Sequence, residues 1–376
     1  MSVPLSYIHI SRANLEHNIG VFRKRLPADT MLVAVVKANA YGHGLKEIVS
    51  IAEPLVDAFQ VDDIEELRAI RVFTAKPVYI FGYVPRGALS ELVALNGILG
   101  VYDLETVSLL STFAQKSGKV IPVHVKIDAL LGRQGILIEE LPMFIEKIKT
   151  YSHVALEAVY SHFSNIEDTD DLDHARKQYK VLIEAKQYAA MHGFPEVRHH
   201  ISATSGFLVE QEGNWGGVFV RLGIGMYGLW PSSQLRKRFS SSITLLPVLS
   251  WMTKLAQVKE VPAGYPIGYG LSYVTAQPMK IGIVPQGYSD GYDRGFSSNG
   301  FVLVGGTSCP IVGRIAMNMF AVDVSGLAGV VEEDTVILIG EQGHEVVSAD
   351  ALAERIGTIN YEIMARISPL LPRRIS

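Results

Sequence analysis

Eight short apolar runs rich in β-branched residues recur through the first 222 residues, and segments with helical patterns separate them. The runs predict strands over residues 33–37, 58–61, 78–81, 98–102, 121–128, 155–162, 199–203 and 218–222. Helices are expected over segments such as 62–72, 103–116 and 171–192, with Asp62 and Asp103 as N-cap residues. Eight strand–helix units in roughly 210 residues favour a TIM-like (β/α)8 barrel. The alternative, a doubly wound parallel sheet, usually has fewer strands and an early phosphate-binding loop.

The pattern changes after Pro231, where short strands punctuated by glycine and proline replace the strand–helix alternation. Strands are expected over residues 249–259, 280–284, 301–304, 319–324 and 335–339. This pattern of short strands is typical of a mainly antiparallel β-domain. The serines at 232, 233 and 240–242 indicate a linker. We therefore predict an α/β chain with a barrel domain over 11–234 and a β-domain over 235–376.

Composition excludes several classes of protein. The net charge of −4 is spread over 376 residues, which argues against a nucleic-acid or membrane-surface partner. The single cysteine, Cys309, cannot form an intramolecular disulfide or a cysteine zinc site, and the histidines show no metal-ligand spacing. The first ten residues contain no signal-peptide core, and no apolar run reaches membrane-spanning length. We expect a soluble cytoplasmic protein with no metal.

Reactive side chains gather where the expected barrel strands end, and this is the face that carries the active site of such barrels. A lysine placed there can form a Schiff base with an aldehyde, since desolvation lowers the pKa of an amine. A lone lysine of this kind more often extends into water, but here other polar residues share its position. They are Lys37 and Tyr41 after the first strand, Arg133 after the fifth, His162 at the end of the sixth, Ser205 after the seventh and Arg221 at the eighth.

The stretch Gly223–Gly228 matches G-x-G-x-x-G, a pattern that also occurs in dinucleotide-binding loops. Here it follows the last barrel strand, and no acidic residue lies between Glu212 and Glu260 to bind a ribose. These glycines instead suit a phosphate held by backbone N–H groups at the end of the barrel.

The segment Ala34–Gly44, with the sequence AVVKANAYGHG, closely resembles the pyridoxal-phosphate attachment motif of the alanine racemases. The resemblance implies that Lys37 holds the cofactor as a Schiff base and that Tyr41 binds its phosphate. Further matches follow in family order across nearly the whole chain. They imply Arg221 facing the pyridine nitrogen, Ser205, Gly223, Ile224 and Tyr361 as further cofactor ligands, Tyr269 as a second catalytic base, Tyr288 at the substrate entrance and Met317 at the substrate carboxylate.

By this resemblance the chain is a racemase that interconverts L- and D-alanine, supplying D-alanine for the bacterial cell wall. Lys37 and Tyr269 act on opposite faces of the α-carbon, and a chain from Tyr269 through His162 to Arg221 supports the tyrosine. Arg133 and the Met317 amide hold the carboxylate. The family also implies a homodimer with shared active sites and a strand within 1–10 that joins the β-domain. Lys126 matches a position that many members carbamylate.

The chain departs from the family pattern at three places, Asp128–Leu131, Thr204 and Asn318. The first and third lie near the expected substrate, so a racemase of serine or of broader specificity is an alternative. A fold-related amino-acid decarboxylase would require an acidic partner for the pyridine nitrogen, so Arg221 argues against a decarboxylase. A non-catalytic pyridoxal-phosphate carrier would need only the barrel, so the β-domain argues against that.

Overall fold

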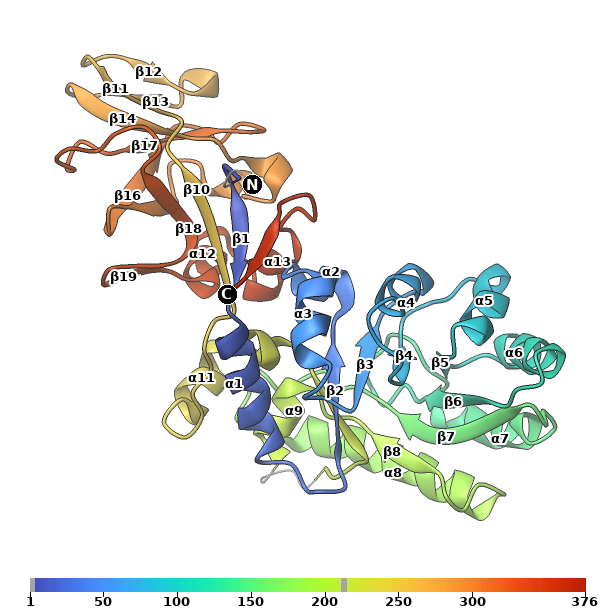
Figure 1. Cartoon of the computed structure of the whole chain (residues 1–376). Coiled ribbons are helices and arrows are strands. Elements are labelled where there is room, and N and C mark those ends of the chain that lie inside the picture. The colour runs from blue at the N-terminus through green and yellow to red at the C-terminus, as the bar shows by residue number, and fades with distance from the viewer. Residues whose placement is uncertain (1–3, 211–214) are drawn as a thin grey trace. The chain divides into compact units, whose positions relative to one another are not determined.

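The computed structural model describes residues 4–210 and 215–376 and divides into two compact units (Figure 1). The barrel unit comprises Glu16–Ala38 and Val49–Leu246. The β-unit comprises Met1–Leu15, Asn39–Ile48 and Pro247–Ser376. The segment Asn39–Ile48 therefore belongs to the β-unit, although it lies between the first two barrel strands in the sequence.

Among its described residues, the barrel unit contains eight parallel strands, one for each of the eight predicted runs. They are β2 (Met31–Val35), β3 (Ala58–Val61), β4 (Val78–Ile80), β5 (Gly97–Val101), β6 (Ile121–Lys126), β7 (Val154–Tyr160), β8 (Arg198–His200) and β9 (Phe219–Leu222). Their order is β8-β7-β6-β5-β4-β3-β2-β9, with every neighbouring pair parallel. A parallel bridge between Ala203 and Arg221 joins the two ends of this sheet. The predicted (β/α)8 barrel is confirmed.

Helices follow the barrel strands and lie outside the curved sheet in Figure 1. They are α4 (Ile64–Ile70), α5 (Leu89–Ala94), α6 (Leu104–Lys116), α7 (Leu141–Ile148), α8 (Asp173–Met191) and α9 (Thr204–Leu208). Asp103 caps α6 as predicted, since its side chain accepts a hydrogen bond from Thr106 N. The prediction that Asp62 is the N-cap of α4 is wrong by one residue. Asp63 accepts from Glu66 N, whereas the carboxylate of Asp62 pairs with Lys37.

The predicted linker after the barrel is partly a helix, α11 (Ser233–Phe239). The side chain of Ser232 accepts a hydrogen bond from Leu235 N, which makes it an N-cap, and Leu235 is buried. Serine is as common at helix N-caps as in linkers. The serine-rich composition therefore did not distinguish the two.

Aromatic and histidine side chains fill the barrel interior rather than aliphatic residues alone. His124 and His200 are fully buried, and His124 Nδ1 lies 3.0 Å from His200 Nε2. The rings of Tyr160 and His200 stack with centroids 5.0 Å apart. Burial lowers the pKa of both histidines, so the pair is neutral at physiological pH.

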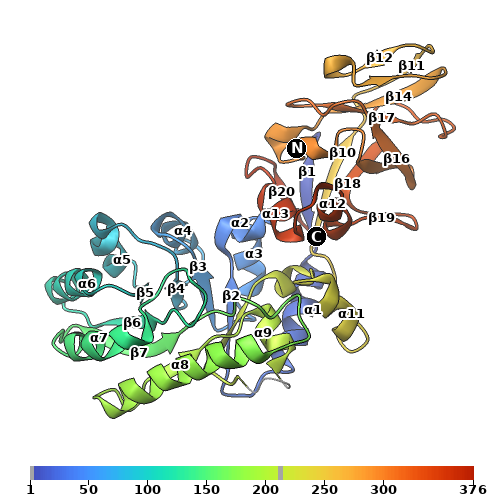
Figure 2. The same cartoon turned by 180° about the vertical axis from the view of Figure 1, so that it is seen from behind.

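The β-unit is built on one large, mainly antiparallel sheet. Its strands are β1 (Tyr7–Ile10), β10 (Leu249–Lys254), β11 (Gln257–Val261), β14 (Met279–Val284), β15 (Phe301–Val304), β16 (Thr307–Val312), β17 (Phe320–Asp323), β18 (Thr335–Gln342), β19 (Glu345–Val347) and β20 (Arg373–Ile375). The N-terminal β1 pairs antiparallel with β10 and parallel with β20, as the resemblance implied. Figure 2 shows the same strands from behind, with α12 (Ala349–Ile356) and α13 (Asn360–Ala365) beside one another.

The strand expected over 249–259 is two strands, because its halves pair with different partners. β10 pairs with β1 and β18, whereas β11 pairs with β14. The change occurs at Leu255 and Ala256, whose N–H groups donate to Asp334 O and Ile283 O. Both halves alternate β-forming and polar residues without an intervening glycine or proline, so nothing in the local sequence marks the break.

No helix among the described residues is both long and apolar enough to cross a membrane. Within residues 4–210 and 215–376, no group of three or more His, Cys, Asp or Glu side chains is arranged to hold a metal ion.

Candidate active site

The residues after β2 form a left-handed turn, α2 (Lys37–Tyr41). Ala38, Asn39, Ala40 and Tyr41 have φ angles between 53° and 54°. A left-handed conformation costs an L-residue about 1–2 kcal/mol. Four consecutive residues of this kind persist only where the surroundings enforce them, and such strain is concentrated at functional sites.

Side-chain groups hold both ends of this turn. In the barrel unit, the carboxylate of Glu66 accepts hydrogen bonds from Ala38 N at 2.6 Å and Asp62 N at 2.8 Å. In the β-unit, Asn39 Oδ1 accepts from Leu45 N at 2.9 Å. Gly42, at φ 78°, closes the turn, and a Cβ there would collide with the backbone carbonyl of Met364. Lys37 is therefore presented by a rigid, specifically braced segment.

The amine of Lys37 has an acidic partner that the sequence did not reveal. Lys37 Nζ lies 3.2 Å from Asp62 Oδ1, and the lysine side chain is 40% exposed. The lysine is accessible and paired, rather than desolvated at the end of the strand as expected. A carboxylate at this distance holds the amine in place.

Tyr41 lies beside Tyr361, the other tyrosine that the resemblance assigns to the cofactor phosphate. Their ring centroids are 6.1 Å apart in the β-unit. Tyr361 is on α13. Two predicted ligands that are 320 positions apart in the sequence are thus brought together.

Arg221 lies at the end of β9 and is only 5% exposed. Its Nη2 donates to the carbonyls of Ser161 at 2.9 Å and Ile201 at 2.5 Å, and lies 3.4 Å from His162 Nδ1. Burial and the positive charge of Arg221 lower the pKa of His162 well below its usual value. The structure thus contains the His162–Arg221 link of the predicted chain, with a fixed cation beside a neutral imidazole.

Lys126 on β6 is buried, with Nζ 4.6 Å from the ring centroid of Tyr160. Burial, together with the charges of Arg221 and Arg133, lowers its pKa well below the usual value. Its amine is therefore far less protonated than that of an exposed lysine. Arg133 itself is exposed in the loop after β6.

The residues expected around the phosphate lie at the ends of β8 and β9. Ser205 is buried on α9, and its hydroxyl donates to Glu167 Oε1 at 2.5 Å. Thr204 Oγ1 accepts hydrogen bonds from Gly223 N at 3.2 Å and Gly225 N at 3.3 Å. Gly223 and Ile224 begin the short turn after β9. Sequence reasoning missed Glu167, which lies five residues beyond His162 in a loop that shows no strand or helix periodicity.

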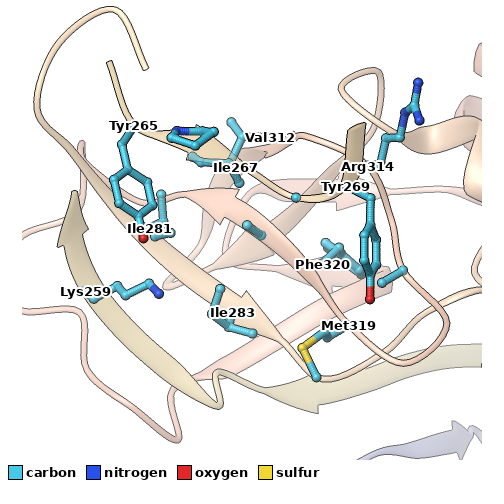
Figure 3. Close-up of a pocket in the computed structure, with 14 residues that line it drawn as sticks. Lys259, Tyr265, Ile267, Tyr269, Ile281, Ile283, Val312, Arg314, Met319 and Phe320 are labelled. Atoms are coloured by element: carbon cyan, nitrogen blue, oxygen red, sulfur yellow. The ribbon is translucent and has the colours of Figure 1, made fainter. Parts of the chain in front are cut away.

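A pocket of about 400 Å³ within the β-unit adjoins Tyr269, the predicted second base (Figure 3). Figure 3 shows Lys259 and Tyr265 on one side of this pocket, and Tyr269 with Met319 on the other. Ile267 and Ile281 line it and belong to the hydrophobic core of the β-unit. The Tyr269 side chain is 72% exposed, so its phenol is available to a molecule that approaches this surface.

Tyr288 and Met317 are held together by their backbones. Tyr288 N donates to Ala316 O at 3.2 Å, and Ser289 N donates to Met317 O at 3.0 Å. Asn318, one of the departures from the family pattern, donates to Ser289 Oγ at 2.8 Å, and Ser289 Oγ donates to Met317 O at 2.8 Å. The expected entrance residue and the expected carboxylate ligand therefore form one interlocked pair of loops.

His43, directly after the left-handed turn, is expected to make the stability of the fold depend on pH. It is fully buried, its Nδ1 donates to Tyr41 O at 3.0 Å, and burial lowers its pKa to about 4. The unfolded chain binds a proton at this histidine below about pH 6.5, whereas the folded chain does not. Stability should therefore fall as the pH decreases from 6.5 to 4, by about 3 kcal/mol from this residue.

Urea unfolding followed between pH 7 and pH 4.5 tests this expectation. A His43→Gln variant should be less stable at pH 7 and should show a correspondingly weaker loss of stability in acid. An unchanged pH dependence in the variant would mean that His43 does not cause the loss.

The fold and the site together define a class of protein, a two-domain barrel enzyme with a rigidly presented lysine at the end of a barrel strand. Comparison with family models makes the assignment more specific. Residues 10–231 match the alanine racemase N-terminal domain, and residues 248–375 match the alanine racemase C-terminal domain. The chain belongs to the alanine racemase family and is an isomerase.

Individual relatives agree with this assignment. An alanine racemase of Leptospira interrogans is 35% identical over 98% of this chain and 95% of its own length. The crystal structure of alanine racemase from Bacillus anthracis with bound L-Ala-P superposes with a TM-score of 0.92 at 30% identity, covering 100% of this chain and 96% of that one. An alanine racemase from Bartonella henselae with covalently bound pyridoxal phosphate shares the fold, with a TM-score of 0.87 at 24% identity and full coverage of both chains.

Proposed function

We propose that this chain is a pyridoxal-phosphate-dependent alanine racemase in which Lys37 holds the cofactor, and Lys37 and Tyr269 exchange the α-proton of the substrate. The observation that supports this most strongly is the braced left-handed turn at the end of β2 in a chain that matches the family over both domains. The proposed domains are a cofactor-binding barrel over 11–234 and a β-domain over 235–376 that includes the N-terminal strand. The proposed compartment is the cytoplasm, and the proposed role is supply of D-alanine for the cell wall.

The residues present fit this cofactor. The buried guanidinium of Arg221 can only donate hydrogen bonds, so it suits an unprotonated pyridine nitrogen. The paired rings of Tyr41 and Tyr361, the hydroxyl of Ser205 and the Gly223–Ile224 backbone supply donors for a phosphate. Lys37 supplies the accessible amine that would hold the aldehyde carbon.

When bound, pyridoxal phosphate withdraws electrons from an attached amino acid and acidifies its Cα–H bond. Lys37 Nζ would then take or return the α-proton on one face, and the Tyr269 hydroxyl would do so on the other. The configuration of the α-carbon is inverted because one residue removes the proton from one face and the other residue delivers a proton to the opposite face. His162 is held neutral beside Arg221, whose Nη2 donates toward His162 Nδ1, so its Nε2–H would donate a hydrogen bond to the Tyr269 oxygen and stabilise the tyrosinate. Arg133 and the Met317 N–H would bind the carboxylate, with Tyr288 at the entrance.

The proposed assembly is a homodimer with two shared active sites. Tyr269 and its pocket lie in the β-unit and Lys37 lies in the barrel unit. A head-to-tail pair with two-fold symmetry would place the Tyr269 of one protomer at the Lys37 of its partner and would create two equivalent sites.

Lys126 is a proposed site of carbamylation. Its buried amine has a strongly lowered pKa, and an unprotonated amine is the form that attacks carbon dioxide. The resulting carbamate would carry a negative charge in the field of Arg133 and Arg221, which both act on this amine. It would thereby orient Arg133 toward the substrate carboxylate.

The test of the proposed function is formation of the D-enantiomer from L-alanine by the purified full-length protein supplied with pyridoxal phosphate. L-serine, L-lysine and L-arginine are assayed in parallel, because Ala129, Leu130 and Asn318 change the polarity expected near the substrate. We expect D-alanine as the main product. Release of carbon dioxide would identify a decarboxylase instead, and cofactor binding without turnover would identify a carrier.

Substitution of Arg221 by glutamate tests the role given to this residue. A carboxylate would favour a protonated pyridine nitrogen and a stronger electron sink. We expect slower racemisation and more transamination, measured as pyridoxamine phosphate formed per racemisation event. Arg221→Lys serves as the control that keeps the charge. An unchanged ratio in Arg221→Glu would refute the role.

A further inference from the structure

The carboxyl group of Glu167, to which no function has been assigned above, contacts Ser205, a predicted phosphate ligand. The hydroxyl of Ser205 donates its hydrogen bond to Glu167 Oε1 at 2.5 Å. A serine hydroxyl has one proton to donate. While Glu167 accepts that proton, Ser205 cannot donate it to a phosphate oxygen.

The position of Glu167 is set by the backbone as well as by its side chain. The carbonyl oxygen of Glu167 accepts a hydrogen bond from Ser232 Oγ at 2.5 Å. Ser232 is also the N-cap of α11, where it accepts from Leu235 N. The loop after β7 is thus fastened to the start of α11, and this contact directs Glu167 toward α9.

The surroundings of Glu167 disfavour its negative charge. Burial raises its pKa, the Ser205 hydrogen bond opposes that shift, and the neighbouring Asp168 adds to it. α9, which carries Ser205, has no titratable side chain, and the basic residues of α11 lie in its last turn, away from the Ser232 cap. Asp170 and Asp171 follow in the same loop. Among the described residues, no ion pair involves Glu167.

We propose that Glu167 is a positioning residue that regulates cofactor affinity through its protonation state, by competing with the cofactor phosphate for the Ser205 hydroxyl. The ionised carboxylate holds the hydroxyl and repels a phosphate dianion. The protonated carboxyl releases the hydroxyl and can itself donate to a phosphate oxygen. The inference rests on the proposed function, because it takes Ser205 as a phosphate ligand.

The test measures binding rather than turnover. Pyridoxal phosphate is titrated into the cofactor-free full-length protein between pH 6 and pH 8.5, and binding is followed by absorbance. Pyridoxal, which lacks the phosphate, is titrated alongside. The variants are Glu167→Gln, Ser205→Ala and Asp168→Asn, the last as a control that removes a neighbouring charge without touching Ser205. The phosphate's own ionisation affects all variants alike, so differences between them isolate Glu167.

We expect Glu167→Gln to bind pyridoxal phosphate about tenfold more tightly than the wild type at pH 8, a gain typical of one charged contact, and the gain should shrink as the pH is lowered. Its affinity for pyridoxal should match that of the wild type, and Asp168→Asn should show a smaller gain. If Ser205→Ala weakens binding but Glu167→Gln matches the wild type at every pH, the inference is wrong and the phosphate site stands. If Ser205→Ala binds as the wild type does, the phosphate site in the proposed function is wrong as well.

Discussion

Replacing Tyr269 by phenylalanine is expected to slow racemisation in both directions by roughly 10²- to 10⁴-fold, the contribution typical of a general acid–base residue. The side chain is 72% exposed beside its pocket, so loss of the hydroxyl should leave the β-unit folded. Lys37 is untouched and should still hold the cofactor. In deuterated water the variant should therefore exchange the α-hydrogen of one enantiomer without inverting it, which NMR together with chiral chromatography detects.

Tyr265→Phe is the matched control for this experiment. Tyr265 lines the same pocket and is 41% exposed, but it has no catalytic role in the account. Its activity should remain within about threefold of the wild type, as expected for an exposed residue outside the chemistry. Equal losses in the two variants would show that the pocket's shape, rather than the Tyr269 hydroxyl, supports activity.

Two inactive variants, Lys37→Ala and Tyr269→Ala, should restore activity to one another when they are unfolded and refolded together. If each active site takes its lysine from one protomer and its tyrosine from the other, a mixed dimer carries both defects in one site and none in the other. Random pairing should then give about one intact site in four. The measurement is the racemase activity of the mixture relative to the wild type at equal concentration.

Each variant refolded alone is the control, and both should stay inactive. Subunit exchange is checked with protomers that carry tags of different mass. A mixture that contains mixed dimers but has no more activity than its parents would show that Tyr269 acts within its own chain.

The barrel was predictable because each strand carries its own local signal. The strands around Ala58 and Val78 are buried at every position, as parallel strands covered on both faces should be. Polar residues at the ends of these runs could then be assigned to one face of the barrel from topology alone. Lys37, His162, Ser205 and Arg221 lie at or just beyond the ends of β2, β7, β8 and β9, the positions expected from the strand pattern.

The features that sequence reasoning missed depend on contacts between distant segments. The break between β10 and β11 arises from their different sheet partners, and the left-handed turn after Lys37 is enforced in part by Glu66. Asp62 and Asp63 are adjacent and chemically identical, and their different roles, pairing with Lys37 and capping α4, follow from contacts in the fold. Glu167 lies in an irregular loop, and its effect on Ser205 requires the fold to bring the two together.

The proposed racemase chemistry depends most directly on Lys37 as the residue that holds the cofactor. The purified protein is loaded with pyridoxal phosphate, reduced with borohydride, digested and analysed by mass spectrometry. We expect the phosphopyridoxyl group on the peptide that contains Lys37, and its absence from a Lys37→Ala variant that is treated identically. Attachment of the group to Lys126 or to any other lysine, with Lys37 unmodified, would contradict the role proposed for Lys37.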